Sequence, residues 1–302
     1  MSDKTATRCG FIAILGAPNV GKSTLINRLV GTKVSIVSPK VQTTRTRVLG
    51  IVIRDEAQIV FIDTPGIFAP KRRLDRAMVG AAWGGAKDAD TVLLLIDANR
   101  GIDEDGRRIL DRLKESRRRV TVAINKIDLV AKPSLLTLAA QLDAEGLFSS
   151  IHMISAETGD GVDDLMTALA AGVLPGPWMF PEDQISDMPQ RLLAAEITRE
   201  KIYLQLQQEL PYAATVVTEN WEERADGSAA IQQIIYVRRT SQRAIVLGKA
   251  GARIKAIGAA ARQELEYLLE RRIHLFLFVK VRDKWEEDRE HYQDWGLDFD
   301  AP

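Results

Sequence analysis

The first half of the chain alternates short apolar runs with segments whose apolar residues recur at helical spacing. The apolar runs predict strands at 10–15, 48–54, 57–62, 91–97, 119–124 and 150–154. The helical spacing predicts helices near 22–30, 72–86, 104–116, 134–145 and 162–171. Strands that alternate with helices favour a mostly parallel sheet covered by helices on both faces. We therefore expect an α/β domain over residues 1–175.

The pattern changes after this region. Glycines and prolines interrupt both periods between 172 and 190, which indicates a linker over 176–190. The elements expected beyond it are a helix at 191–208, strands at 214–218 and 231–237, a short helix, a longer helix to about 271 and a strand at 273–281. This α-β-β-α-α-β order predicts a smaller α+β domain over 191–302. The acidic, aromatic tail 285–302 is expected to pack on that smaller domain.

Composition narrows the class of protein. A chain of 302 residues with 46% hydrophobic and 27% charged residues is typical of a globular protein with room for two domains. The formal net charge is zero, so any nucleic-acid site must come from local clustering of basic residues. The single cysteine, Cys9, excludes a disulfide framework and a cysteine zinc site. No apolar run reaches membrane-spanning length and the start lacks a signal-peptide pattern, so we expect a cytoplasmic protein.

Residues 16–23, GAPNVGKS, fit the phosphate-loop pattern G-x-x-x-x-G-K-[ST] between a predicted strand and a predicted helix. That setting aims backbone N–H groups and a helix N-terminus at one anion. Lys22 adds a positive charge at the phosphates, and Ser23 offers a hydroxyl to Mg²⁺. The residues expected to bind nucleotide here are Gly16, Ala17, Pro18, Asn19, Val20, Gly21, Lys22, Ser23 and Thr24.

A second motif, Asp63-Thr64-Pro65-Gly66, ends the predicted strand at 57–62. A carboxylate at Asp63 can hold Mg²⁺ through water, and the N–H of Gly66 can reach a γ-phosphate that disappears on hydrolysis. Such a turn after a strand is common by itself. Here it indicates a nucleotide site because it lies downstream of the phosphate loop.

The motif Asn125-Lys126-Ile127-Asp128 follows another apolar strand and indicates which base the bound nucleotide has. The Asp128 carboxylate can accept hydrogen bonds from N1–H and the 2-amino group of guanine, which adenine lacks. The aliphatic part of Lys126 can cover the base, and backbone N–H groups of Ser155 and Ala156 complete the pocket. The expected ligands are therefore GTP and GDP with Mg²⁺.

The polar segment 41–47 lies between the phosphate loop and Asp63, where a GTPase needs a threonine that ligates Mg²⁺ and senses the γ-phosphate. Thr44 is our choice, and Thr43 is the close competitor that sequence cannot separate. With Ser23 and Asp63, Thr44 makes the expected metal set. The alternative is a solvated threonine-rich loop.

Ile67 follows the Asp63 motif, at a position where many small GTPases place a glutamine that orients water. An isoleucine cannot hydrogen-bond water, so we expect slow intrinsic hydrolysis or another route. Asn19 could coordinate a monovalent cation beside the β- and γ-phosphates, or it could only cap the loop. The residues expected to act in hydrolysis are Lys22, Asn19, Thr44 and Gly66.

These motifs resemble the Era family, bacterial GTPases of the translation-factor-like group implicated in small-subunit ribosome assembly. The resemblance is carried by G-A-P-N-V-G-K-S-T, Q-T-T-R-T-R, D-T-P-G-I, N-K-I-D and S-A-E-T-G, and it covers nearly the whole chain. It implies a P-loop GTPase domain joined to a type II KH domain, and K⁺-assisted hydrolysis, as in several members. By resemblance only, it also implies peripheral association with the inner membrane, which has no support in the sequence itself. We expect a monomer that does not bind DNA.

The turn Gly248-Lys249-Ala250-Gly251 joins two predicted helices, as the G-x-x-G turn of KH domains does. There it lets about four nucleotides approach a helix N-terminus closely. No Asp or Glu occurs from Gly227 to Gln263, while basic residues including Arg253 and Lys255 make a local phosphate-seeking field. Six residues, Gly248, Lys249, Ala250, Gly251, Arg253 and Lys255, are therefore expected to bind RNA. The resemblance implies the 3′ end of small-subunit, 16S-type ribosomal RNA and the small subunit as partners.

The sequence thus favours a GTP-hydrolysing switch coupled to ribosomal RNA. Two other classes stay open at this point. In one, the chain is an RNA-binding module whose nucleotide site is only structural or sensory. In the other, a signalling GTPase uses its small domain to bind protein instead of RNA.

Overall fold

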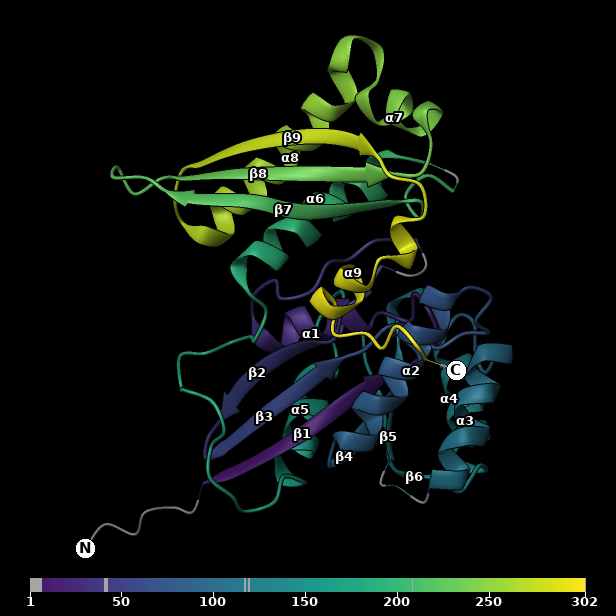
Figure 1. The fold of residues 1–302 in the computed structure, drawn as a ribbon. Coiled ribbons are helices and arrows are strands. Elements are labelled where there is room, and N and C mark those ends of the chain that lie inside the picture. The colour runs from purple at the N-terminus through teal and green to yellow at the C-terminus, as the bar shows by residue number, and fades with distance from the viewer. Residues whose placement is uncertain (1–6, 41–42, 117, 119, 208, 302) are drawn as a thin grey trace, which may run out of the picture. The chain divides into compact units, whose positions relative to one another are not determined.

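The computed structural model describes residues 7–40, 43–116, 118, 120–207 and 209–301. Val41 and Gln42 of the predicted switch segment lie outside these ranges. The described chain forms two units (Figure 1). Among the described residues, the first unit comprises those within 7–35, 44–187 and 292–301, and the second comprises those within 36–40, Thr43 and 188–291.

The first unit is built on a six-stranded sheet in the order β2-β3-β1-β4-β5-β6. Its strands are β1 (Arg8–Leu15), β2 (Val48–Arg54), β3 (Ala57–Asp63), β4 (Thr91–Asp97), β5 (Val120–Asn125) and β6 (Phe148–Met153). Only the β2–β3 pair is antiparallel among these described strands, so the prediction of a mostly parallel sheet is confirmed. Every residue of β3 is buried, as expected for a strand covered on both faces.

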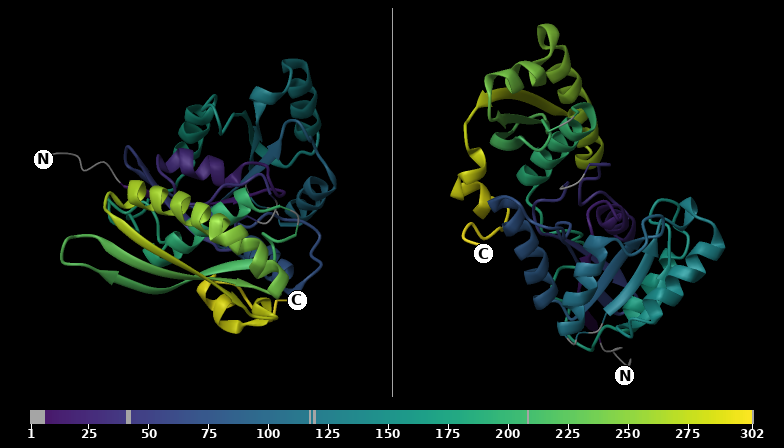
Figure 2. Two further views of the ribbon diagram at one scale, coloured as in Figure 1. Left: turned by 90° about the horizontal axis from the view of Figure 1, so that it is seen from above. Right: turned by 90° about the vertical axis from the view of Figure 1, so that its right-hand side faces the viewer.

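Helices lie on both faces of this sheet (Figures 1 and 2). They are α1 (Lys22–Val30), α2 (Arg73–Asp88), α3 (Glu104–Ser116), α4 (Lys132–Asp143) and α5 (Val162–Ala171), with a 3₁₀ turn η1 (Ile127–Leu129). Their apolar stripes meet the apolar strands, as Leu110 on α3 and Leu94 on β4 do in the buried core. The packing leaves the loops that follow β1, β3 and β5 at one edge of the sheet, because parallel strands end together.

The expected linker is partly built into the first unit. The backbone N–H of Ile51 on β2 donates to the carbonyl of Ile185 at 2.9 Å, and the Gly50–Ser186 pair forms a β-bridge. Gln58 on β3 is fully buried and its side chain accepts the N–H groups of Met179 and Phe180. Glycine and proline break the helix and strand periods here, yet the backbone still finds partners at a sheet edge.

The second unit packs helices on a three-stranded sheet in the order β7-β8-β9. The strands are β7 (Ala214–Glu223), β8 (Ala229–Val237) and β9 (Ile273–Val281), and the helices are α6 (Gln190–Gln205), α7 (Thr240–Leu247) and α8 (Ala252–Leu269). A 3₁₀ turn, η2 (Lys249–Gly251), separates α7 from α8. β8 runs antiparallel to β7 and parallel to β9, which gives the predicted α-β-β-α-α-β domain.

The end of the chain differs from the expectation. The turn η3 (Trp285–Glu287) does belong to the second unit, where the buried indole of Trp285 donates to the carbonyl of Ala213 at 3.0 Å. Residues 292–302, which begin within α9 (Arg289–Asp294), group instead with the first unit. There the guanidinium of Arg73 on α2 lies 4.3 Å from the ring centroid of Phe299, a cation–π contact. The second unit is thus smaller than the expected domain 191–302.

Candidate nucleotide and nucleic-acid sites

Lys22 is buried at the start of α1, with 6% of its surface exposed. Its ammonium donates to the carbonyls of Gly16 at 3.1 Å and Ala17 at 3.0 Å, so the side chain lies back along the phosphate loop. Burial lowers the pKa of Lys22 to about 8, and the nearby Asp63 carboxylate only partly offsets this effect. The positive charge of Lys22 is only partly balanced by Asp63 and stands in a loop of backbone N–H donors, which suits the loop to bind phosphate.

Two glycines, one in the phosphate loop and one in the turn after β3, are required by close approach. Gly21 has φ of +100°, and a Cβ there would lie 2.3 Å from the amide nitrogen of Asn125. A Cβ on Gly66 would lie 2.9 Å from the Cα of Pro18, so the turn after β3 approaches the phosphate loop at backbone distance. The N–H of Ile67 then donates to the carbonyl of Gly16 at 3.1 Å.

The three predicted metal residues lie together. The hydroxyl of Ser23 is 2.9 Å from that of Thr44 and donates to a carboxylate oxygen of Asp63 at 3.1 Å. Sequence reasoning missed Ser35, whose hydroxyl donates to the same carboxylate oxygen at 2.7 Å. Burial raises the pKa of Asp63, whereas the Ser35 hydroxyl and Lys22 act in the opposite direction. Hydroxyl and carboxylate oxygens around one point are the ligand types that Mg²⁺ prefers.

Thr43 takes a different direction from Thr44. Its hydroxyl donates to the carbonyl of Lys40 at 2.7 Å and lies 2.8 Å from the hydroxyl of Ser38. Of the two candidate threonines, only Thr44 therefore lies beside Ser23 in the described structure.

The base motif is tied to the phosphate loop. The side chain of Asn125 donates to the carbonyl of Val20 at 2.8 Å and accepts the N–H of Ala156 at 2.8 Å. The ammonium of Lys126 donates to the carbonyl of Asn19 at 2.7 Å and to the Asp97 carboxylate at 2.6 Å. Asp97 ends β4, and sequence analysis did not single it out because an acidic residue after an apolar strand has many uses.

The other residues expected to bind the base, Asp128, Ser155 and Ala156, come after β5 and β6 at the same edge of the sheet. Asp128 is exposed on η1, so its carboxylate is available to a ligand. Ser155 is buried, and its hydroxyl accepts the N–H of Thr158 at 3.1 Å, which fixes the turn that carries Ala156. A third residue that sequence reasoning missed, after Ser35 and Asp97, is Arg28 on α1, whose guanidinium donates to the carbonyl of Ala156.

Asn19 and Ile67 have contrasting environments. Asn19 is exposed and has φ of +64°, a left-handed conformation that asparagine tolerates better than most residues. Ile67 is buried, with 5% of its surface exposed, so its side chain packs in the core beneath the loop. A water-orienting group at position 67 is thereby excluded.

Comparison with known proteins identifies the family. The model for the 50S ribosome-binding GTPase matches residues 11–126, and the KH domain model matches residues 209–286. GTPase Era of Brucella suis is 58% identical over 298 residues, which are 99% of this chain and 96% of that protein. GTPase Era of Sinorhizobium medicae is 60% identical over 293 residues, 97% of this chain and 94% of the relative. The chain belongs to the Era family of GTPases.

Solved structures of Era give the same answer. A variant of Aquifex aeolicus Era bound to GDP and AlF4⁻ has a TM-score of 0.91 and 41% identity, covering 96% of this chain and 99% of that one. Era in complex with MgGDPNP and nucleotides 1506–1542 of 16S ribosomal RNA gives the same TM-score, identity and coverage. As a member of the Era family, this chain is an enzyme that hydrolyses GTP, and its two units are the GTPase domain and the KH domain.

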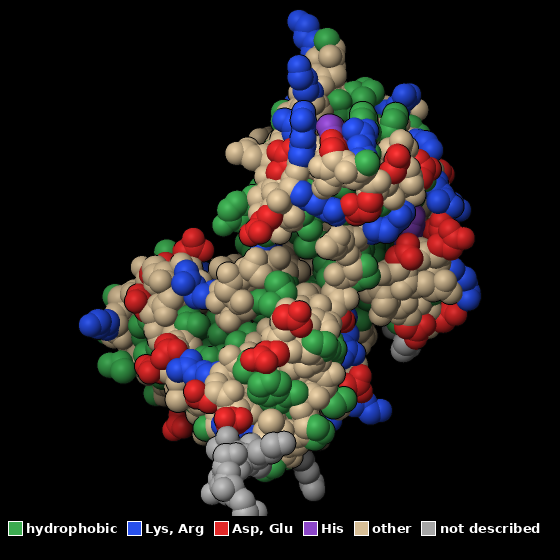
Figure 3. Space-filling view, turned by 90° about the vertical axis from the view of Figure 1, so that its left-hand side faces the viewer, with side chains coloured by type: hydrophobic (Ala, Val, Ile, Leu, Met, Phe, Trp, Pro, Cys, Tyr) green, Lys and Arg blue, Asp and Glu red, His purple; other side chains and the backbone are tan. Residues whose placement is uncertain are grey.

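In the KH domain, the turn before α8 needs its first glycine. Gly248 has φ of +71°, and a Cβ there would lie 2.7 Å from the Cβ of Arg253. Gly251, with φ of +77°, begins α8 as its N-cap. Lys249 and Ala250 between them are exposed, so the positive charge of Lys249 is accessible to solvent. Lys and Arg side chains stand at the α7 end of this domain in the space-filling view (Figure 3).

A groove of about 330 Å³ continues from this turn between α8 and β9. Its floor is apolar and its rim is basic: it is lined by Ile254, Lys255, Gly258, Ala259, Arg262, Leu275 and Leu277. Gly258 brings the helix close to the strand, since a Cβ there would lie 3.3 Å from the side chain of Leu277. Splayed bases suit such a floor, and phosphates suit the rim.

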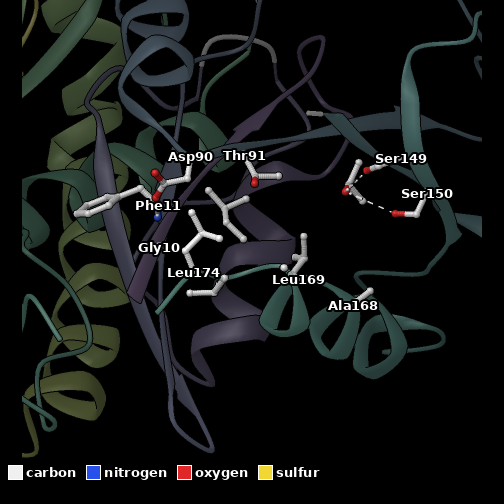
Figure 4. A pocket seen from close by; sticks show the side chains of 13 residues that line it. Gly10, Phe11, Asp90, Thr91, Ser149, Ser150, Ala168, Leu169 and Leu174 are labelled. Atoms are coloured by element: carbon white, nitrogen blue, oxygen red, sulfur yellow. Dashed lines mark hydrogen bonds between the residues drawn. The ribbon is translucent and has the colours of Figure 1, made fainter. Parts of the chain in front are cut away.

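Another pocket, of about 290 Å³, lies at the opposite edge of the large sheet, where the strands begin (Figure 4). The Asp90 carboxylate in it accepts the N–H of Phe11 at 2.8 Å, and the Thr121 hydroxyl lies 3.4 Å from that of Ser149. Its polar groups already bond to one another, and no predicted nucleotide residue lines it. We assign no ligand to this pocket.

The described residues contain no helix long and apolar enough to cross a membrane.

Proposed function

We propose that this chain binds Mg²⁺ and GTP at the edge formed by residues 16–23, Asp63 and residues 125–128, and binds the 3′ end of 16S ribosomal RNA in the α8–β9 groove. In this role it assists assembly of the small ribosomal subunit. The observation that carries the proposal is the pairing, on one chain, of the Ser23–Thr44–Asp63 cluster with a basic-rimmed KH groove. The Era structure with MgGDPNP and a 16S ribosomal RNA segment has both kinds of ligand.

In the proposed mechanism, Lys22 and the loop N–H groups neutralise the phosphates. Ser23 and Thr44 contribute hydroxyl ligands to Mg²⁺, and Asp63 accepts hydrogen bonds from the metal's water. The metal, when bound, neutralises charge on the β- and γ-phosphates. Water attacks the γ-phosphorus in line, the bond from that phosphorus to the β–γ bridging oxygen breaks, and GDP is the leaving group. Loss of the released phosphate removes the partner of Thr44 and of the Gly66 N–H.

We also propose that Asn19 holds a K⁺ ion at the phosphates. Ile67 cannot orient water, and the exposed Asn19 side chain stands on the loop itself. GTP turnover should be faster in potassium than in sodium for the native chain, and equal in both for Asn19→Gly. Glycine keeps the left-handed backbone and removes only the side chain. Equal turnover of the native chain in both salts removes this part of the proposal.

RNA binding is tested with the full chain, the GTP analogue GppNHp and an RNA of the 3′-terminal 16S sequence. The double variant Lys249→Glu/Lys255→Glu should weaken binding at least tenfold and reduce its salt dependence, because phosphate contacts are lost. Arg224→Glu makes the same kind of change in the turn between β7 and β8 and should stay within twofold. Equal loss in both variants indicates a general charge effect, and no loss in either removes the groove as the RNA site.

A further inference from the structure

Three successive N–H groups in the turn after β6 differ in whether the protein already supplies an acceptor. The N–H of Ser155 donates to the carbonyl of Asp160 at 2.9 Å, and the N–H of Ala156 donates to the side chain of Asn125 at 2.8 Å. The N–H of Glu157, an exposed residue, has no hydrogen-bond acceptor in the part of the chain that the structure describes. The two N–H groups that sequence analysis expected at the base are therefore bonded within the protein, and the next one remains for a ligand.

The guanidinium of Arg28 holds two carbonyls of this turn. Its Nε donates to the carbonyl of Ala156 at 2.5 Å, and its Nη2 contacts the carbonyl of Glu157. Gly159, with φ of +99°, lets the turn close on the guanidinium, because a Cβ there would lie 2.9 Å from Nη1 of Arg28. Arg28 stands in the last turn of α1, and both α1 and the turn belong to the first unit. The helix that begins at the phosphate loop thus also fastens the turn beside the base motif.

The contact with Ala156 sets the direction of the Glu157 N–H. A peptide bond is planar and trans, so the carbonyl of Ala156 and the N–H of Glu157 lie in one plane and point in opposite directions. Because Arg28 holds the carbonyl from α1, the N–H points away from α1. Asn125 of the base motif lies against the same turn, since it accepts the Ala156 N–H. The unbonded donor therefore belongs to a turn that the base motif contacts.

We infer that Arg28 is a positioning residue for base specificity: by holding the Ala156 carbonyl, it aims the Glu157 N–H at O6 of guanine. The inference rests on the proposed base-binding role of Asp128, which takes the N1–H and 2-amino donors of guanine. O6 is the acceptor beside those donors. Adenine has an amino group at that position, so a backbone N–H there would face another donor and stay unpaired. Asp128 and Arg28 thus act on different atoms of the same base.

The test measures, by calorimetry with the full chain, the binding of three diphosphates that differ by one group. IDP lacks the 2-amino group of GDP, whereas 6-thio-GDP keeps that group and has sulfur, a weak acceptor, in place of O6. Arg28→Met keeps an unbranched side chain on α1 and removes the guanidinium donors. We expect the affinities for GDP and IDP to fall about fivefold each, and the affinity for 6-thio-GDP to stay within about twofold.

Two further variants serve as controls. Arg28→Lys keeps an ammonium that can donate to the Ala156 carbonyl, so it should recover most of the loss, and any loss that remains should again spare 6-thio-GDP. In the matched control, Arg118→Met, the lost guanidinium likewise donates to two carbonyls, those of Ala86 at 2.6 Å and Ala89 at 2.7 Å. Arg118 precedes β5, whereas the base motif follows that strand, so this variant should leave all three affinities within about twofold of the native values.

Two outcomes would overturn the inference. Equal losses for all three diphosphates in Arg28→Met would mean that Arg28 supports the whole site without acting on O6, and no loss would mean that the turn keeps its geometry without Arg28. Asp128→Asn separates these failures from a failure of the proposed base site. It should change the preference for GDP over IDP, which depends on the 2-amino group. An unchanged preference in Asp128→Asn would remove the proposed base site, and the role of Arg28 with it.

Discussion

The hydroxyl oxygens of Ser23 and Thr44 lie 2.9 Å apart, although the two residues are 21 positions apart in the chain. Ser23 is fixed by the first turn of α1, whereas Thr44 comes from an irregular segment. The proposed metal site thus combines a residue of a helix with a residue of an irregular segment.

Replacing Thr44 by valine keeps the side-chain shape and removes the hydroxyl. We expect Mg²⁺-dependent GppNHp affinity to fall about tenfold, or ~1.4 kcal/mol, because the metal ion loses one hydroxyl ligand. GDP affinity should change little. Fluorescence titration at several Mg²⁺ concentrations measures both. Thr43→Val is the control, and a larger effect from it than from Thr44→Val would reverse the assignment of the metal ligand.

Asp128 should decide which base is bound. Asp128→Asn replaces an acceptor by an amide, so guanine loses a partner for its N1–H and 2-amino donors while xanthine gains a donor for its 2-oxo group. We expect GDP affinity to fall at least tenfold and XDP affinity to rise. Asp143→Asn, at the exposed end of α4, is the control. Unchanged GDP affinity in Asp128→Asn would contradict the base assignment.

Nucleotide affinity should fall as the pH rises above 8. The pKa of Lys22 is lowered to about 8 by burial, and bound phosphates raise it again by favouring the charged ammonium. The complex therefore binds more protons than the free protein above that pH, and binding takes up a proton. The expected loss approaches tenfold per pH unit. Calorimetry between pH 7 and 9 in buffers of different ionisation enthalpy counts the protons, and no uptake at pH 9 would disprove the assignment.

Gln58 should stabilise the attachment of residues 176–187 to the first unit. Gln58→Ala leaves the backbone groups of Met179 and Phe180 without their partners, including the Phe180 carbonyl that accepts at 2.8 Å. We expect the free energy of unfolding to fall by about 2–4 kcal/mol and proteolysis within 176–187 to become faster. Gln141→Ala, exposed on α4, should have little effect in urea unfolding. Similar losses in both variants would mean that Gln58 has no special role.

Local patterns were enough to predict the sheet, its helices and the nucleotide motifs. The phosphate loop and the base motif each have fixed spacing, and parallel strands bring their ends together. Contacts made by common residues at long range could not be predicted. Ser35 looks like any loop serine, and Arg199 on α6 looks like a solvated charge until its burial is seen. The tail follows the same rule, because aromatic composition indicates that residues 292–302 pack somewhere but not on which unit.

The tie between Asn125 and the phosphate loop limits how the base specificity of this chain can evolve. The Asn125 side chain donates a hydrogen bond to the Val20 carbonyl and accepts one from the Ala156 N–H. No side chain fits at Gly21 beside it. A change at either position would damage phosphate binding together with base reading. Asp128 has no such structural duty in its exposed position. A single substitution at Asp128 can thus change which base is bound, whereas a substitution at Asn125 or Gly21 cannot do so without damage to the phosphate loop.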